Sequence, residues 1–172
     1  MFWTNEAGAG EYAVPKCAEG TPPSECVYTT TSLFKVRDSM RKCSSLSDVW
    51  CAPNWNEDGE VMLLRAGTHC HAPACIGTTL YVCPDEATWC NSTNAKLLCK
   101  NSPLYGAGRE DRFDEPNYAA GIPPCLWGTE EQGLQPAPRL KLDTKLFMVK
   151  KVNSTNYHHG VMGQWQMRGA WV

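Results

Sequence analysis

The chain has 172 residues, of which 16 are basic and 18 acidic, so its formal net charge is −2. This length suits one domain with a sizeable buried core. No basic run stands out, which argues against a nucleic-acid-binding protein, and no apolar run is long enough to span a membrane.

The sequence pattern predicts an all-β protein, because 12 prolines and 14 glycines separate short apolar or alternating runs. Residues 1–25 have little periodicity and predict an irregular arm held by cysteines, before a domain over residues 26–172. Seven candidate strands follow in chain order: 26–37, 61–71, 76–83, 95–100, 118–122, 145–152 and 161–171. We therefore expect a disulfide-braced, mainly antiparallel β-sandwich of the jelly-roll type.

The segments between these strands are mostly loops. Residues 37–51 carry only a weak helical pattern, whereas residues 84–94 read as the polar loop of a hairpin and residues 102–117 as a long loop. That long loop contains an acidic cluster whose spacing differs from that of a calcium loop, which favours a solvated acidic segment. The cluster consists of Glu110, Asp111, Asp114 and Glu115.

Ten cysteines are spread along the chain without paired CxxC motifs. This spacing favours a disulfide framework over structural zinc, which needs closely spaced cysteine pairs. We expect all ten to be oxidised, with hairpin loops bringing close neighbours together. They are Cys17, Cys26, Cys43, Cys51, Cys70, Cys75, Cys83, Cys90, Cys99 and Cys125, of which Cys17–Cys26 and Cys83–Cys90 are the expected neighbour pairs.

Two N-glycosylation sequons begin at Asn91 and Asn153, and both lie in predicted polar loops. Together with the cysteines they predict a secreted, extracellular glycoprotein that carries N-linked glycans. The first residues, MFWTNEAGAGEY, do not read as a signal peptide, and the last, GQWQMRGAWV, are strand-like and apolar. We expect a piece of a longer precursor, or a chain whose ends dock against other protein chains or further domains.

The stretch GTHCHAPACIG places His69 and His71 on either side of Cys70. Successive side chains of a β-strand point to opposite faces. The two imidazoles are therefore expected to share one face, where they can lean onto one metal ion, while Cys70 joins a disulfide behind the strand.

A third metal ligand would have to come from elsewhere, and residues 156–165 offer His158, His159 and Met162. A thioether favours Cu(I), whereas a third imidazole suits zinc or copper alike. The alternatives are a chance HxH pattern, a core methionine that fills a gap and a solvated turn at His158 and His159.

Three stretches carry a family resemblance in their order along the chain: GTHCHAPACIGTTLYVC, KLLCKNSPLYGAG and LFMVKKVNSTNYHHGVMGQW. Residues 60–172 resemble the C-terminal copper domain of the copper type II, ascorbate-dependent monooxygenases, the family of peptidylglycine alpha-hydroxylating monooxygenase. They resemble the plant stress-up-regulated nodulin family still more.

The resemblance implies a copper site with His69, His71 and Met162 as ligands, and with His158 or His159 at its rim. The monooxygenases use a second domain with an all-histidine copper site, and this sequence has no second HxH. The resemblance thus implies a copper-binding module that does not hydroxylate a substrate alone. The alternative is a structural or interaction subunit of an extracellular assembly with a vestigial metal site, which the apolar end and the seven tryptophans favour.

Overall fold

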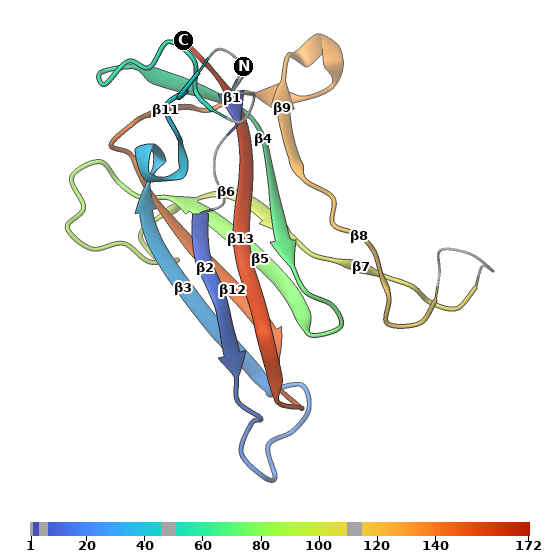
Figure 1. The fold of residues 1–172 in the computed structure, drawn as a ribbon. Coiled ribbons are helices and arrows are strands. Elements are labelled where there is room, and N and C mark those ends of the chain that lie inside the picture. The colour runs from blue at the N-terminus through green and yellow to red at the C-terminus, as the bar shows by residue number, and fades with distance from the viewer. Residues whose placement is uncertain (1, 4–6, 46–50, 110–114) are drawn as a thin grey trace.

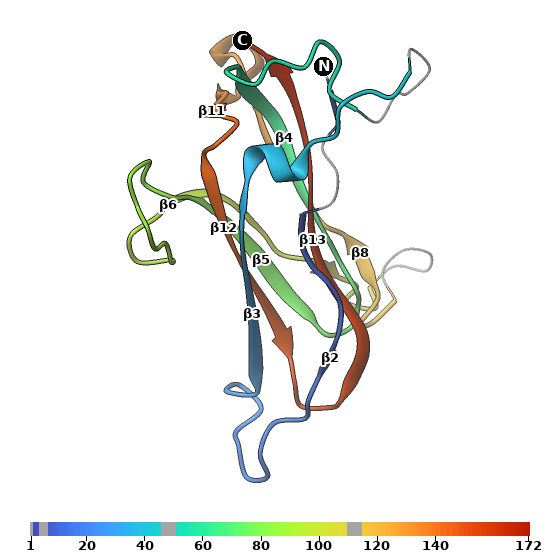
Figure 2. The same ribbon diagram turned by 60° about the vertical axis from the view of Figure 1, so that its left-hand side comes forward.

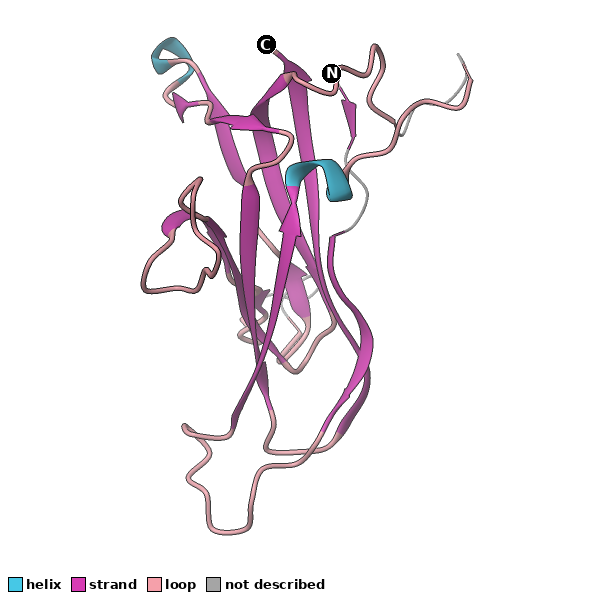
Figure 3. Cartoon of the chain, turned by 90° about the vertical axis from the view of Figure 1, so that its left-hand side faces the viewer, coloured by secondary structure: helices cyan, strands magenta, loops and turns pink. Residues whose placement is uncertain are grey.

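The computed structural model describes residues 2–3, 7–45, 51–109 and 115–172, and these form two β-sheets packed face to face with a small third sheet at one side (Figure 1). Figures 2 and 3 show the two main layers from the side. In Figure 2, strands β3, β5 and β12 lie in one layer and β2, β4 and β13 in the other.

The first sheet has the order β1-β13-β4-β9-β10, with β2 also paired to β13 and β11 paired to β4. Its two long central strands are antiparallel, from the pair Gly163 and Cys70 to the pair Trp171 and Val61. The strands are β1 (Phe2–Trp3), β2 (Ala7–Val14), β4 (Glu60–Cys70), β9 (Cys125–Gly128), β10 (Gln135–Pro136), β11 (Arg139–Lys141) and β13 (His158–Trp171).

The second sheet has the order β3-β12-β5-β6, and every neighbouring pair in it is antiparallel. Its strands are β3 (Val27–Lys35), β5 (Cys75–Val82), β6 (Lys96–Asn101) and β12 (Lys145–Asn153). The small third sheet pairs β7 (Leu104–Tyr105) with β8 (Ala119–Gly121).

The core lies between the two main sheets because the long strands alternate buried and more exposed residues. In β12 the even-numbered positions face inward, and in β13 the odd-numbered positions do. Trp165 of β13 packs in one cluster with Leu80, Leu146 and Met148 of the second sheet, and all four are fully buried. This arrangement confirms the predicted disulfide-braced β-sandwich.

Each of the seven strands predicted from the sequence is present, with boundaries that differ by a few residues. The N-terminal arm is irregular over residues 15–26 but also contains β2, which pairs with β13. The sequence of β2 begins Ala-Gly-Ala-Gly, so it offers no apolar alternation from which a strand could be predicted.

Two short 3-10 helices connect strands, at Val36–Ser39 and Glu130–Gln132. The first coincides with the start of the weak helical pattern over 37–51, of which residues 46–50 lie outside the described part of the chain. Glu110, Asp111 and Asp114 of the acidic cluster also lie outside it. Within the described ranges, no helix has the length and apolar character needed to cross a membrane.

All ten cysteines are paired, as predicted. The two expected neighbour pairs form, and the longest loop is closed by Cys99–Cys125, which joins β6 of the second sheet to β9 of the first. The five disulfides are Cys17–Cys26, Cys43–Cys51, Cys70–Cys75, Cys83–Cys90 and Cys99–Cys125.

Candidate metal centre

The HxH stretch lies at the end of β4, on the outer face of the first sheet. The ring centroids of His69 and His71 are 5.1 Å apart, with the ring planes at 85° to each other. Both side chains are half-buried. Cys70, between them, forms its disulfide with Cys75 at the start of β5. Strand alternation has therefore put the two imidazoles on one side and the sulfur on the other, as predicted.

The ring of His71 is oriented by the closing strand. Its Nδ1 atom lies 2.6 Å from the main-chain carbonyl oxygen of Gly160 in β13. A carbonyl oxygen only accepts hydrogen bonds, so in the neutral imidazole this contact puts the proton on Nδ1 and leaves the lone pair on Nε2. A backbone partner of this kind commonly orients a metal-binding histidine. Nε2 is thus the atom of His71 that is available to a metal.

Met162 belongs to the same face of the sheet. Gln164 is directly opposite His69, and Gly163 is directly opposite Cys70. Opposed residues of an antiparallel pair point to the same side, and side chains two positions apart along a strand do so too. Met162 is two positions before Gln164 and is half-buried, so its thioether lies on the imidazole side of β13.

The remaining two histidines have other surroundings. His158 is opposite Val14 of β2 and lines a shallow cleft with Pro73 and Asn153. His159 is exposed, and its Nδ1 atom is 3.5 Å from the hydroxyl of Tyr157. Among the described residues, no three His, Cys, Asp or Glu side chains lie close enough to hold one ion. A metal bound by His69 and His71 would therefore need a donor of another kind.

An unpaired polar atom sits beside this pair. The Oε1 atom of Gln164 is buried, and no hydrogen-bond donor of the described chain reaches it. Gln164 is directly opposite His69. A buried amide oxygen without a partner is costly unless a water, a ligand or a cation satisfies it. The face that carries the two imidazoles and the thioether therefore also carries an amide oxygen without a described partner.

Gln164 was not among the site residues predicted from the sequence. The signal was available, because alternation along the last strand puts Gln164 on the same face as Met162. What the sequence does not contain is the pairing of β13 with β4, which brings residues far apart in the chain together.

Both predicted glycosylation sites adopt the same local turn. The Oδ1 atom of Asn91 accepts hydrogen bonds from the main-chain nitrogen (2.9 Å) and the hydroxyl (2.7 Å) of Thr93. Asn153 accepts the equivalent bonds from Thr155 at 2.9 and 2.8 Å. Asn91 lies in the predicted loop, whereas Asn153 is the last residue of β12 and only the rest of its sequon lies in the turn that follows. Both Asx turns engage the amide oxygen and direct Nδ2, the atom that a glycan would occupy, away from the turn.

A buried lysine lies behind the candidate centre, between the two sheets. Lys150 is fully buried on the inward face of β12, and burial lowers its pKa to about 8. Its Nζ atom is 6.0 Å from the centre of the Tyr12 ring and has no hydrogen-bond partner in the described ranges. Gly163 makes room for it, since a Cβ there would lie 2.5 Å from the Lys150 Cδ atom.

Comparison of the chain with protein-family models, curated proteins and solved structures found no match. The resemblance to the copper monooxygenases and the nodulin family therefore stays an expectation from the sequence.

Proposed function

We propose that this protein is a secreted copper-binding module in which His69 and His71 hold Cu(I) with the thioether of Met162 as a further donor. The observation that carries the proposal is the orientation of the imidazole pair. The rings share one face at 5.1 Å, and the Gly160 carbonyl leaves Nε2 of His71 free to coordinate.

The donor set supports copper more than zinc. A structural zinc ion takes four strong nitrogen, sulfur or carboxylate ligands, whereas the described chain brings two such ligands together at His69 and His71. A soft thioether selects Cu(I). The amide oxygen of Gln164 would be satisfied by the bound ion or by a water on it. Bound copper would supply one-electron chemistry, for which a substrate site or a second copper site would have to come from another domain or chain.

The disulfide framework supports an extracellular location. Five disulfides in a β-domain of this size are typical of proteins that mature in an oxidising compartment. Both sequons lie at turns between strands and have oriented acceptor amides, which suits N-linked glycans at Asn91 and Asn153. We therefore place copper binding outside the cell or in the secretory route.

A competition titration with a chromogenic Cu(I) chelator tests the proposal. Protein secreted by a eukaryotic host should bind one Cu(I) per chain. His69→Ala should abolish binding because it removes one of the two imidazoles. Met162→Leu, which is close in volume, should weaken Cu(I) binding while Cu(II) and Zn(II) binding change less. Full Cu(I) affinity in the His69→Ala variant would refute the proposal.

His159→Ala serves as the matched control. It removes an exposed imidazole from the same strand as Met162. If the thioether is the third donor, this variant keeps the Cu(I) affinity of the unchanged protein. If an imidazole fills that place instead, His158→Ala or His159→Ala weakens binding and Met162→Leu does not.

A second candidate function, a structural subunit of an extracellular assembly, is favoured by a separate observation. Four apolar side chains lie directly opposite one another across all four strands of the second sheet, on its outer face: Leu33, Phe147, Tyr81 and Leu97. Leu33 is 49% exposed and Leu97 is 55% exposed. Contiguous exposed apolar surface often marks an interface. If this function holds, Leu33→Lys changes the assembly state in sedimentation, and His69→Ala does not.

A further inference from the structure

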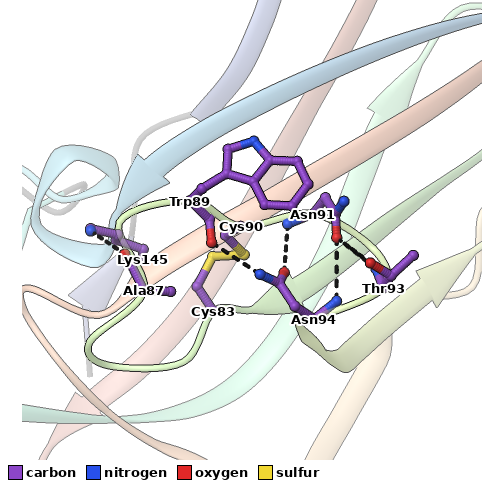
Figure 4. The surroundings of a disulfide bond; sticks show 8 residues. All are labelled: Cys83, Ala87, Trp89, Cys90, Asn91, Thr93, Asn94 and Lys145. Carbon is purple, nitrogen blue, oxygen red and sulfur yellow. Dashed lines mark hydrogen bonds between the residues drawn. A yellow bond between two sulfur atoms is a disulfide. The ribbon is translucent and has the colours of Figure 1, made fainter.

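The loop between β5 and β6 is fixed at several points (Figure 4). The Cys83–Cys90 disulfide closes it, and the Nζ atom of Lys145 donates a hydrogen bond to the Ala87 carbonyl at 2.8 Å. Asn94 connects its far side, because its Nδ2 atom donates to the Trp89 carbonyl at 3.0 Å and its Oδ1 atom accepts from the Asn91 main-chain nitrogen at 2.8 Å. The backbone from Trp89 to Asn94 is thus held in one conformation.

The side-chain amide of Asn91 is held as well. Its Oδ1 atom accepts from the Asn94 main-chain nitrogen at 3.2 Å, in addition to both bonds from Thr93. Three donors on one oxygen fix the plane of the amide. They direct Nδ2 to the opposite side, away from the turn.

Trp89 stands two residues before this amide and is 66% exposed, the largest exposed fraction among the large apolar side chains that the structure describes. Cys90, between the two, is buried in its disulfide. Figure 4 shows the Trp89 indole and the Asn91 side chain on the same side of the loop. A rigid loop therefore presents a bare aromatic face beside a fixed glycan acceptor.

We infer that the Trp89 indole is the binding surface for the first N-acetylglucosamine of a glycan on Asn91. The inference rests on the glycosylation in the proposed function. In that transfer, Nδ2 of Asn91 bonds to C1 of an oligosaccharide carried on a polyprenyl diphosphate. The C1–oxygen bond breaks, the diphosphate leaves with its electron pair and the amide loses one proton.

Chemical complementarity favours this contact. One face of a pyranose ring carries several C–H groups, which are apolar and slightly positive. The face of an indole ring is apolar and electron-rich. Packing the two together removes apolar surface of both from water. Because disulfide and hydrogen bonds already order the loop, little further conformational freedom is lost when the sugar settles on the ring.

The second sequon provides an internal comparison. Asn153 has the same Asx turn as Asn91, with its oxygen bonded to Thr155 in the same way. The residue two positions before it is Lys151, which offers no aromatic face. A glycan on Asn91 should therefore be held against the protein, and one on Asn153 should not be held in this way.

A double-mutant cycle tests the contact. The full chain is secreted from cells that make only high-mannose glycans and is trimmed with endoglycosidase H to one N-acetylglucosamine per site. Removing the sugar by Asn91→Gln should lower Tm by about 2–4 °C more in the Trp89 protein than in the Trp89→Ala protein. Asn91→Gln also removes the Asx turn, but it does so in both the Trp89 and the Trp89→Ala protein, so this contribution to the Tm change cancels in the comparison. The Asn153→Gln and Trp89→Ala changes should be additive.

A spectroscopic measurement reports the same contact without using stability. In protein with isotope-labelled sugars, ring-current shielding by the indole should move the C–H resonances of the sugar on Asn91 upfield, and those on Asn153 should stay at free-sugar values. Trp89→Leu keeps an apolar side chain and should abolish the shift. If the Trp89→Ala protein is not secreted, the Trp89→Leu variant still tests whether the sugar contacts the indole.

Three results would overturn the inference: additive effects of Asn91→Gln and Trp89→Ala, an unshifted sugar spectrum at Asn91, or an unmodified Asn91 in protein secreted by a eukaryotic host. Copper titration of the Asn91→Gln variant keeps this test separate from the proposed copper site. That variant should bind Cu(I) as the unchanged protein does.

Discussion

The Nδ1 atom of His71 lies 2.6 Å from the carbonyl oxygen of Gly160, and this contact connects the HxH stretch to the closing strand. Gly160 has a φ of +69°, a conformation that side chains other than glycine adopt at a cost. The same glycine therefore sets the direction of the carbonyl and, through it, the proton position on the imidazole. A change at Gly160 should therefore alter the proposed copper site without removing any of its proposed ligands.

We expect Gly160→Ala to lower the free energy of unfolding by about 1–2 kcal/mol, the usual cost of a left-handed non-glycine residue. It should also weaken Cu(I) binding by roughly tenfold, the lower end of the effect of losing an outer partner of a metal ligand. Chemical denaturation and chelator competition measure the two effects.

Gly133→Ala is the matched control for that prediction. Gly133 has a φ of +71°, and an added Cβ at either glycine meets no described atom within 4 Å. It follows the 3-10 helix at Glu130–Gln132, away from the HxH stretch. Both variants should lose similar stability, and only Gly160→Ala should lose copper affinity. Equal affinities in the two variants would show that the His71 contact does not tune the site.

Because Lys150 is buried, we expect an unusual pH dependence of the free energy of unfolding. Burial lowers its pKa in the folded protein to about 8, from 10.5 for a free lysine. Between these values the unfolded chain binds more protons, so the stability contributed by this residue rises with pH. Below about pH 8 the lysine is charged in both states, and the full cost of burying the charge remains.

Urea denaturation between about pH 7 and 9.5 should therefore show stability rising through the upper half of this range. Lys150→Met should be more stable at pH 7 by roughly 1–4 kcal/mol, by analogy with apolar replacements of buried charges, and should lose the slope. Burial raises the pKa of Tyr12, so the pH is kept below the range in which tyrosine ionises. Lys151→Met, at the exposed neighbouring position, should keep the slope of the unchanged protein.

Strand alternation explains how much of the site could be predicted. It was enough to place His69 and His71 together with Cys70 behind them, because these positions lie within one strand. It did not reveal the partner of that strand, since the pairing of Gln164 with His69 joins positions far apart in the chain and depends on the register of two strands. The unpaired Oε1 atom of Gln164 and the contact between His71 and the Gly160 carbonyl could not be predicted without knowledge of that register.

The same distinction holds for the disulfides and for the N-terminal arm. Cys17–Cys26 and Cys83–Cys90 could be predicted because short loops bring neighbours together. Cys99–Cys125 spans 26 residues and depends on the packing of two sheets. Strand β2 was missed because its glycines and alanines have no periodic contrast, and its place is determined by hydrogen bonding to β13.

The sheet-bridging disulfide should contribute more stability than a hairpin disulfide. In the loop-entropy relation, a loop of 26 residues at Cys99–Cys125 gives about 3.5 kcal/mol, and one of 7 residues at Cys83–Cys90 gives about 2.4 kcal/mol. The paired changes Cys99→Ala with Cys125→Ala, and Cys83→Ala with Cys90→Ala, allow comparison by denaturation. Equal losses would indicate that packing strain or residual structure in the unfolded chain offsets the entropy difference.

Gln164→Glu tests whether the orphaned amide oxygen belongs to the metal centre. The change keeps the shape of the side chain and puts a carboxylate opposite His69. A carboxylate is a harder ligand than an amide or a thioether, so it favours Zn(II) and Cu(II) over Cu(I). We expect Zn(II) affinity to rise at least about tenfold, a gain of about 1.4 kcal/mol, with little change for Cu(I). Gln166→Glu is the matched control. Gln166 is the next residue of β13 on the same face, two positions after Gln164, and is opposite Gly67. This variant adds the same charge and should change Zn(II) affinity much less. An equal gain in Zn(II) affinity in both variants would mean that the added charge attracts the cation from a distance and that Gln164 does not contact it.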